Sequence, residues 1–278
     1  MSPSKPHPSP TPGDRAPAVF VWLCGTLLAW PGAADASAAP PDDMSALYKT
    51  TCAICHEVPQ TKAPPTDTLR RLPASQILMA MEFGKMQPQA AVLKHEQRVE
   101  LAKWLAAEED GKRDAWIAAN ACARETPVPV SGIENWGLGR HNTRHAQGVG
   151  INRRNVDRLS LQWSSALPAV TTMRSQPVIA GDTVFLGSKG GHLLALDRRS
   201  GCVRWSFRTD APVHSALTLD RTPDGVATLF FADEMATVHA VDATTGRLRW
   251  RARLTCFPTS PVSGPATYFD GRLYVPVS

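Results

Sequence analysis

Two segments of this chain repeat each other 45 residues apart. Residues 195–205 read ALDRRSGCVRW, and residues 240–250 read AVDATTGRLRW. From about residue 135 onward, short β-branched and aromatic runs alternate with turns rich in Gly, Asp and Pro, which indicates an all-β region. A period of about 40 to 50 residues with four strands in each unit predicts the blades of a β-propeller.

The residues that recur in the repeat have structural explanations. We expect the side chains of Asp197 and Asp242 to bond to the backbone ahead of them, and the Gly that follows to adopt a positive φ. The Trp that ends each repeat is expected to wedge between neighbouring blades. Trp and Asp are not adjacent here, unlike in WD-type repeats. The same pattern extends to the strand-like runs 182–186 and 272–275, and to 161–163, which looks like the end of an earlier unit.

Upstream of the repeats, Cys52-Ala53-Ile54-Cys55-His56 has the spacing of a c-type haem attachment motif. Two thiols at this spacing add to the two vinyl groups on one edge of the porphyrin, and the His ligates the iron. Half of a zinc site would need a second Cys/His pair, and a redox CxxC would need a thioredoxin-like βαβ context. Neither context is present. The motif therefore predicts covalent haem, with His56 as an iron ligand.

Short helices are predicted around this motif. Asp42-Asp43 is suited to cap a helix that delivers Cys52 at its end. Pro73 is expected as the first residue of a helix that continues over 74–83 and stops at Gly84. A third amphipathic helix is expected over 93–107. Three short helices around one CxxCH make residues 40–110 resemble a small all-α class I cytochrome c.

The sixth iron ligand decides what such a haem does. A thioether ligand leaves the iron six-coordinate and suited to passing electrons. Met86 follows Gly84 on a loop that is free to turn its sulfur toward the ring, and we favour it. Met79 and Met81 lie inside the helix, where Met more often fills a core. His95 is the competing ligand, although at the start of a helix it is expected to be a solvated surface residue.

The chain has 278 residues, a net charge of +5 and 43% hydrophobic residues, and no basic run with interleaved aromatics indicates nucleic-acid binding. Residues 1–36 have the pattern of a signal peptide, with Lys5 and Arg15, an apolar core at 16–30 and small residues near 34–38. The core is shorter than a spanning helix, so we expect no stable membrane span. An uncleaved anchor stays open. Cleavage would remove Cys24, and export would bring the chain to the periplasm.

The repeat signature resembles the pyrroloquinoline quinone (PQQ) repeat of quinoprotein dehydrogenases, and residues 135–144 look like the first segment of that family. The order of cytochrome first and propeller second resembles quinohaemoprotein dehydrogenases of the polyvinyl-alcohol dehydrogenase type. The resemblance implies oxidation of secondary alcohols, polymeric ones included, with PQQ and Ca²⁺, and electron transfer through haem c to a downstream acceptor. It implies PQQ contacts at Arg174, Gln176 and His214, where some relatives have Glu in place of Arg174 and Arg in place of His214. The catalytic residue is unknown.

Residues 135–278 are fewer than the propeller of that family requires. Eight blades need about 350 residues, so about three blades are expected here. The family keeps its Ca²⁺ ligands and catalytic Asp in later blades, and we expect an incomplete propeller that needs further blades or a partner chain. Residues 111–134, with Pro127 and Pro129, are expected to be a linker or docking segment in which Trp116 packs on either neighbour.

Three cysteines lie outside the signal and the haem motif: Cys122, Cys202 and Cys256. An odd number in an oxidising compartment leaves one unpaired. We expect a disulfide between Cys122 and Cys202 that ties the linker to the first repeat, and the other pairings stay open.

Three functions are compatible with these features. The leading hypothesis is a periplasmic quinohaemoprotein alcohol dehydrogenase, or the N-terminal portion of one. The second is an electron-transfer cytochrome c whose propeller is a noncatalytic scaffold. The third is a repeat scaffold without catalysis, which the CxxCH motif argues against because such a scaffold has no use for haem.

The export signal generates a first prediction. Produced without residues 1–36, the chain should accumulate in the cytoplasm as haem-free protein, because haem is attached to CxxCH motifs outside the cytoplasm. Absorption spectra of the purified full-length and shortened chains measure the haem content. Mature covalent haem in the shortened chain would contradict the export hypothesis.

Overall fold

The computed structural model describes residues 43–123, 137, 143–144, 150–254, 262 and 264–277. These residues belong to one compact unit, Pro41–Ser278. The expected signal at 1–36, residues 124–134, most of the segment 135–144 and Cys256 lie outside the described residues. Within the described ranges, no helix is long and apolar enough to cross a membrane.

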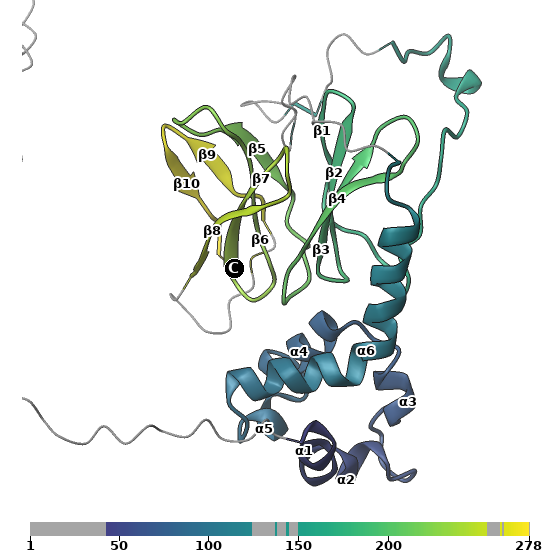
Figure 1. The fold of residues 1–278 in the computed structure, drawn as a ribbon, viewed down its shortest axis with the longest axis vertical. Coiled ribbons are helices and arrows are strands. Elements are labelled where there is room, and N and C mark those ends of the chain that lie inside the picture. The colour runs from purple at the N-terminus through teal and green to yellow at the C-terminus, as the bar shows by residue number, and fades with distance from the viewer. Residues whose placement is uncertain are drawn as a thin grey trace, which may run out of the picture. The chain divides into compact units, whose positions relative to one another are not determined.

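The part of the chain around the CxxCH motif is a small helical domain (Figure 1). Its helices are α1 (Met44–Thr51), α2 (Ala53–His56), α3 (Thr66–Leu69), α4 (Ala74–Glu82), α5 (Gln87–Ala90) and α6 (His95–Ala119). They pack around one apolar core in which Tyr48, Leu78 and Leu101 are at most 2% exposed. The predicted cap of the first helix is confirmed: Oδ1 of Asp43 accepts a hydrogen bond from the Ser45 N–H at 2.9 Å.

The second predicted helix differs in detail at both ends. Pro73 is the N-cap of α4 rather than its first helical residue, because its ψ of 146° is extended. The helix ends at Glu82, and Gly84 follows the C-cap residue. A Cβ at position 84 would lie 2.8 Å from the Ala80 Cα. Glycine is therefore required here, because after the helix the chain packs directly against its last turn. The Met86 N–H donates to the Ala80 carbonyl oxygen at 3.0 Å.

The third predicted helix is much longer than its apolar pattern indicated. α6 has 25 residues and continues through 111–119, where a linker was expected. Its last turns are stabilised by contacts outside the helical domain, because Trp116 and Ile117 pack against Leu194, Leu196 and Val203. The sequence of the helix alone could not reveal that its last turns pack on apolar residues of the sheet.

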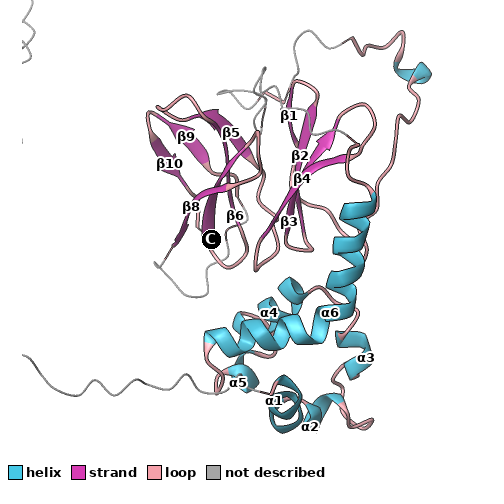
Figure 2. Ribbon diagram, viewed as in Figure 1, coloured by secondary structure: helices cyan, strands magenta, loops and turns pink. Residues whose placement is uncertain are grey.

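The rest of the described chain is antiparallel sheet, preceded by the 3-10 helix η1 (Val156–Arg158) (Figure 2). The first sheet, blade 1, has the order β1 (Val178–Ala180), β2 (Thr183–Ser188), β3 (His192–Asp197), β4 (Val203–Arg208). The second, blade 2, has the order β5 (Thr218–Arg221), β6 (Ala227–Ala232), β7 (Thr237–Asp242), β8 (Leu248–Arg253). β9 (Thr267–Phe269) and β10 (Arg272–Tyr274) form a two-stranded sheet. These sheets are part of a β-propeller and do not close into a ring, as expected.

The sequence repeat is reproduced strand by strand. β3 pairs with β4 so that His192 faces Arg208, and β7 pairs with β8 so that Thr237 faces Arg253. Both hairpins have a register shift at the same step, between Ala195 and Leu196 in β3 and between Ala240 and Val241 in β7. Positions 45 residues apart are therefore equivalent in space as well as in sequence.

Trp163 and Trp205 each pack on a turn of the following blade, which confirms the predicted wedge for Trp205, whereas Trp250 is 42% exposed and packs on Phe230. The indole N–H of Trp205 donates to the Ala243 carbonyl oxygen at 3.1 Å, and a Cβ on Gly246 would lie 2.7 Å from its ring. Trp163 makes the same contacts with the turn at Gly201. Both glycines have positive φ, +71° and +76°. Only glycine meets the backbone and the contact requirement at once.

This contact gives a second prediction. Gly246→Ala should destabilise the protein by the cost of positive φ for alanine, about 1–2 kcal/mol, plus about 1–3 kcal/mol because the Trp205 ring must move. The midpoint of urea denaturation, followed by tryptophan fluorescence, measures the loss.

Gly225→Ala is the matched control, because Gly225 has φ +81° and nothing within 4 Å of an added Cβ. Gly225→Ala should lose only the stability that corresponds to the cost of positive φ for alanine. Equal losses for the two variants would mean that the tryptophan contact contributes nothing.

Candidate functional site

The CxxCH motif forms one short helical turn. Cys52 is the C-cap of α1, and the next four residues are α2. Cys52 is partly buried and Cys55 exposed, and both are free thiols. Burial raises the pKa of the Cys52 thiol, and the nearby Cys55 raises it further. The two thiols are unpaired and three positions apart in the sequence, as two thioether bonds to one porphyrin edge require.

His56 is held in one orientation. Its ring is 7% exposed, and Nδ1 lies 2.6 Å from the Pro64 carbonyl oxygen. A carbonyl oxygen only accepts hydrogen bonds, so Nδ1 carries a proton, and in the neutral tautomer that this bond favours the lone pair lies on Nε2. Hydrogen bonds of this kind orient a metal-binding imidazole and increase its basicity. Haem therefore fits the donor set of this turn.

An open cleft of ≈ 690 Å³ lies beside the motif. It is lined by His56, by the loop that follows it, which includes Glu57, and by Asp67 of α3 and Arg70 at the end of that helix. The volume is in the range of sites that hold organic cofactors. Among the residues that the structure describes, no group of three or more His, Cys, Asp or Glu side chains is placed to hold a metal ion.

The candidates for the sixth ligand occupy different environments. Met86 is the N-cap of α5 and packs, partly buried, at the edge of the helical core. Met81 is 5% exposed within that core, and Met79 packs against it, as expected for core methionines. His95 differs from its expected role as a freely solvated residue: its Nδ1 lies 2.8 Å from Oε1 of Glu82. Met86 stays our predicted ligand.

A buried ionic cluster joins α6 to blade 1. Arg113 is fully buried, pairs with Asp110 and donates through Nη1 to the Pro168 carbonyl oxygen at 3.1 Å. Asp110 also pairs with Arg208 of β4. Burial, followed by the charges of Arg113 and Arg208, lowers the pKa of the neighbouring His192 to about 4. Sequence patterns did not identify this cluster. Its only signal was the pair of charged residues Asp110 and Arg113, which lie beyond position 107, where the helix was expected to end.

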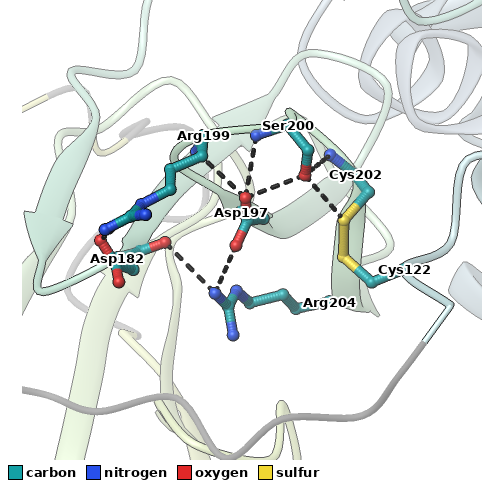
Figure 3. The surroundings of a disulfide bond; sticks show 7 residues. All are labelled: Cys122, Asp182, Asp197, Arg199, Ser200, Cys202 and Arg204. Carbon is teal, nitrogen blue, oxygen red and sulfur yellow. Dashed lines mark hydrogen bonds and ion pairs between the residues drawn. A yellow bond between two sulfur atoms is a disulfide. The ribbon is translucent and has the colours of Figure 1, made fainter.

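The predicted disulfide between Cys122 and Cys202 is confirmed (Figure 3). It lies beside the turn of the first repeat, where Oδ1 of Asp197 accepts hydrogen bonds from the N–H groups of Arg199 and Ser200 at 3.0 and 2.9 Å. Burial acts to raise the pKa of Asp197, but these bonds, the Ser200 hydroxyl and Arg204 outweigh it and hold the pKa at about 2. This aspartate stabilises a turn, as predicted.

The proposed quinone contacts lie on two adjacent segments. Arg174 and Gln176 precede β1, and His214 precedes β5; the two segments are joined by the Ser175 hydroxyl, which donates to the Ser215 carbonyl oxygen at 2.9 Å. Arg174 and Gln176 are exposed. His214 is mostly buried and its Nδ1 contacts the carboxylate of Glu234, while its Nε2 has no partner among the described residues.

These residues fit an anionic quinone only in part. Arg174 is an accessible cation of the kind that pairs with carboxylates. Glu234 lies beside His214 and would repel an anionic ligand there. We therefore assign no step of a reaction to His214.

Residues 134–227 match the family described as "Glucose/ethanol/alcohol dehydrogenase, beta-propeller domain". These residues, which include all of blade 1 and β5 of blade 2, are thus similar to the β-propeller of PQQ-dependent alcohol dehydrogenases. Polyvinylalcohol dehydrogenase of Pseudomonas sp is 29% identical over 280 residues, covering 93% of this chain and 43% of that protein. The enzyme of the same name from Sphingopyxis sp. (strain 113P3) is 28% identical over 265 residues, covering 87% and 40%.

A solved structure, quinohemoprotein alcohol dehydrogenase from Comamonas testosteroni, superposes with a TM-score of 0.42 at 21% identity, over 60% of this chain and 26% of that one. At that level the superposition carries no argument about function. The chain spans 43% and 40% of the length of the two polyvinylalcohol dehydrogenases that it matches.

The predicted iron ligand gives a third prediction. In the exported, haem-containing protein, Met86→Ala should abolish the weak methionine–iron absorption band at long wavelength while covalent haem stays attached through Cys52 and Cys55. Met81→Ala is the control, because Met81 fills the core and its loss should lower stability and leave the band. A band that survives in Met86→Ala and disappears in Met81→Ala would reverse the assignment.

Proposed function

We propose that this chain provides the haem c domain and propeller blades of an exported, PQQ-dependent alcohol dehydrogenase that oxidises secondary alcohols, polymeric ones included. The observation that supports this most is the extent of the similarity to polyvinylalcohol dehydrogenases. It spans 93% of this chain and thus includes the helical domain together with the blades. Export to the periplasm and the presence of Ca²⁺ are parts of the same proposal.

The residues of the helical domain have defined tasks in this proposal. Cys52 and Cys55 would hold haem through thioether bonds, and His56 would bind the iron through Nε2, because Nδ1 is engaged by Pro64. Met86 would complete the coordination. Bound haem c supplies one-electron transfer, whereas a quinone accepts two electrons from an alcohol.

The residues of the blades have fewer defined tasks. Arg174 and Gln176 would contact the quinone from the exposed segment before β1. The contact between His214 and Glu234 favours a second candidate function, an electron-transfer cytochrome whose propeller is a noncatalytic scaffold. The two functions differ in whether alcohol reduces the haem.

A fourth prediction separates them. In the protein isolated from its own host with any partner chains, a secondary alcohol should reduce the haem only when PQQ and Ca²⁺ are present. Stopped-flow absorbance at the haem bands measures the reduction. Cys52→Ser combined with Cys55→Ser should remove haem reduction while an artificial dye still accepts electrons from alcohol. Haem that alcohol never reduces, with PQQ and Ca²⁺ supplied, would support the scaffold alternative.

A further inference from the structure

The outer edge of blade 1 carries an acidic helix. Asp110 and Asp114 of α6 are one helical turn apart, and both contact the guanidinium of Arg208, the second at 3.3 Å. Arg208 is the last residue of β4, the outer strand of the blade. The contact is apolar as well as ionic, because Trp116 and Ile117 cover Val203 at the other end of that strand.

The same segment also pairs with the strand edge. The Cys122 N–H donates to the Val203 carbonyl oxygen at 2.9 Å, and the Val203 N–H donates to the Asn120 carbonyl oxygen at 2.8 Å. The disulfide to Cys202 fixes this arrangement covalently. An exposed strand edge is a template for binding another chain, and in blade 1 the molecule itself supplies that chain.

Blade 2 presents the equivalent positions without such a cover. Arg253 stands where blade 1 has Arg208, as the matching registers require. Leu248 replaces Val203 and is 43% exposed, whereas Val203 is 3% exposed. Every residue of β8 is exposed, and no described strand pairs with its outer edge.

The charge on this edge exceeds that of blade 1. Arg247 and Arg251 replace the uncharged Cys202 and Ser206. Within the part of the chain that the structure describes, Arg247, Arg251 and Arg253 have no ionic partner. Arg249, by contrast, pairs with Asp224 and with the hydroxyls of Thr222 and Thr228 at 2.6 Å. The three remaining arginines are available to an external ligand.

We propose that the β8 edge of blade 2 is a docking site for an acidic amphipathic helix of a partner protein. α6 on blade 1 shows the chemistry of the occupant: two carboxylates one turn apart for the guanidinium of Arg253, the equivalent of Arg208, followed by a large apolar side chain for Leu248. Arg251, two residues before Arg253, adds a positive charge that blade 1 lacks. Charged residues on an edge strand also prevent aggregation, but that role alone does not account for an exposed leucine at the position that α6 covers in blade 1. The docking site needs neither haem nor PQQ and is independent of the proposed function.

The test uses this chain's own helix as the probe. A fluorescent peptide of residues 104–123 with Cys122→Ser is titrated with the exported full-length protein, and fluorescence anisotropy gives the Kd. Arg251→Glu combined with Arg253→Glu should weaken binding at least tenfold. Arg153→Glu combined with Arg154→Glu is the matched control, because it makes the same charge change at exposed residues of another segment, and it should change Kd less than twofold.

Two further peptides of equal charge test the recognition of the helix. Asp110→Asn with Asp114→Asn should lose binding, whereas Glu108→Gln with Glu109→Gln should retain it, because only the aspartates face the outer strand in the template. Binding should weaken as salt rises, since the charges are exposed. Equal effects of the two protein variants, equal effects of the two peptide changes, or no binding at low salt would each overturn the proposal.

Discussion

A tryptophan ring packed on a glycine turn joins blade 1 to blade 2, and the same contact joins blade 1 to the segment that precedes it. The contact requires two conditions at once, a positive φ and the absence of a Cβ, and Gly201 and Gly246 meet both. Because Trp163 and Trp205 bind consecutive turns in the same way, the blades are placed at a constant spacing. The segments before β1 and β5, which carry Arg174 and His214, lie side by side and are joined by the hydrogen bond from Ser175 to Ser215.

A second joint attaches the helical domain to blade 1, and it is ionic. Arg113 has no exposed surface, and its pairing with Asp110 compensates for its loss of solvation. Removing one partner of such a buried pair typically costs about 3–5 kcal/mol, because an unpaired charge is left inside. His192 stays neutral at neutral pH since its pKa is about 4, so it adds no third positive charge to Arg113 and Arg208. The disulfide then holds the end of α6 on the same blade.

The haem motif suits its expected cofactor better than the segment around Arg174 and His214 suits a quinone. The haem motif has both thiols free and an imidazole fixed by the Pro64 carbonyl oxygen, so its geometry already suits the expected ligand. The segment around Arg174 offers an accessible cation, but Glu234, which contacts Nδ1 of His214, places a negative charge beside it. An acid beside a proposed anion site weakens that site, whereas a hydrogen-bonded histidine strengthens a metal site.

Local patterns determined much of this molecule. The repeat identified the blades, their turns and their tryptophans, and CxxCH identified the turn at residues 52–56, because each depends on residues close together in the chain. The tertiary structure alone decided the length of α6, the burial of Arg113 and the pairing of His95 with Glu82. These features depend on residues far apart in sequence, and a charged helix face shows no periodic signal until the surface that covers it is known. The difference between the covered edge of blade 1 and the open edge of blade 2 is of the same kind, since the repeat makes their sequences similar and the path of α6 decides which edge is covered.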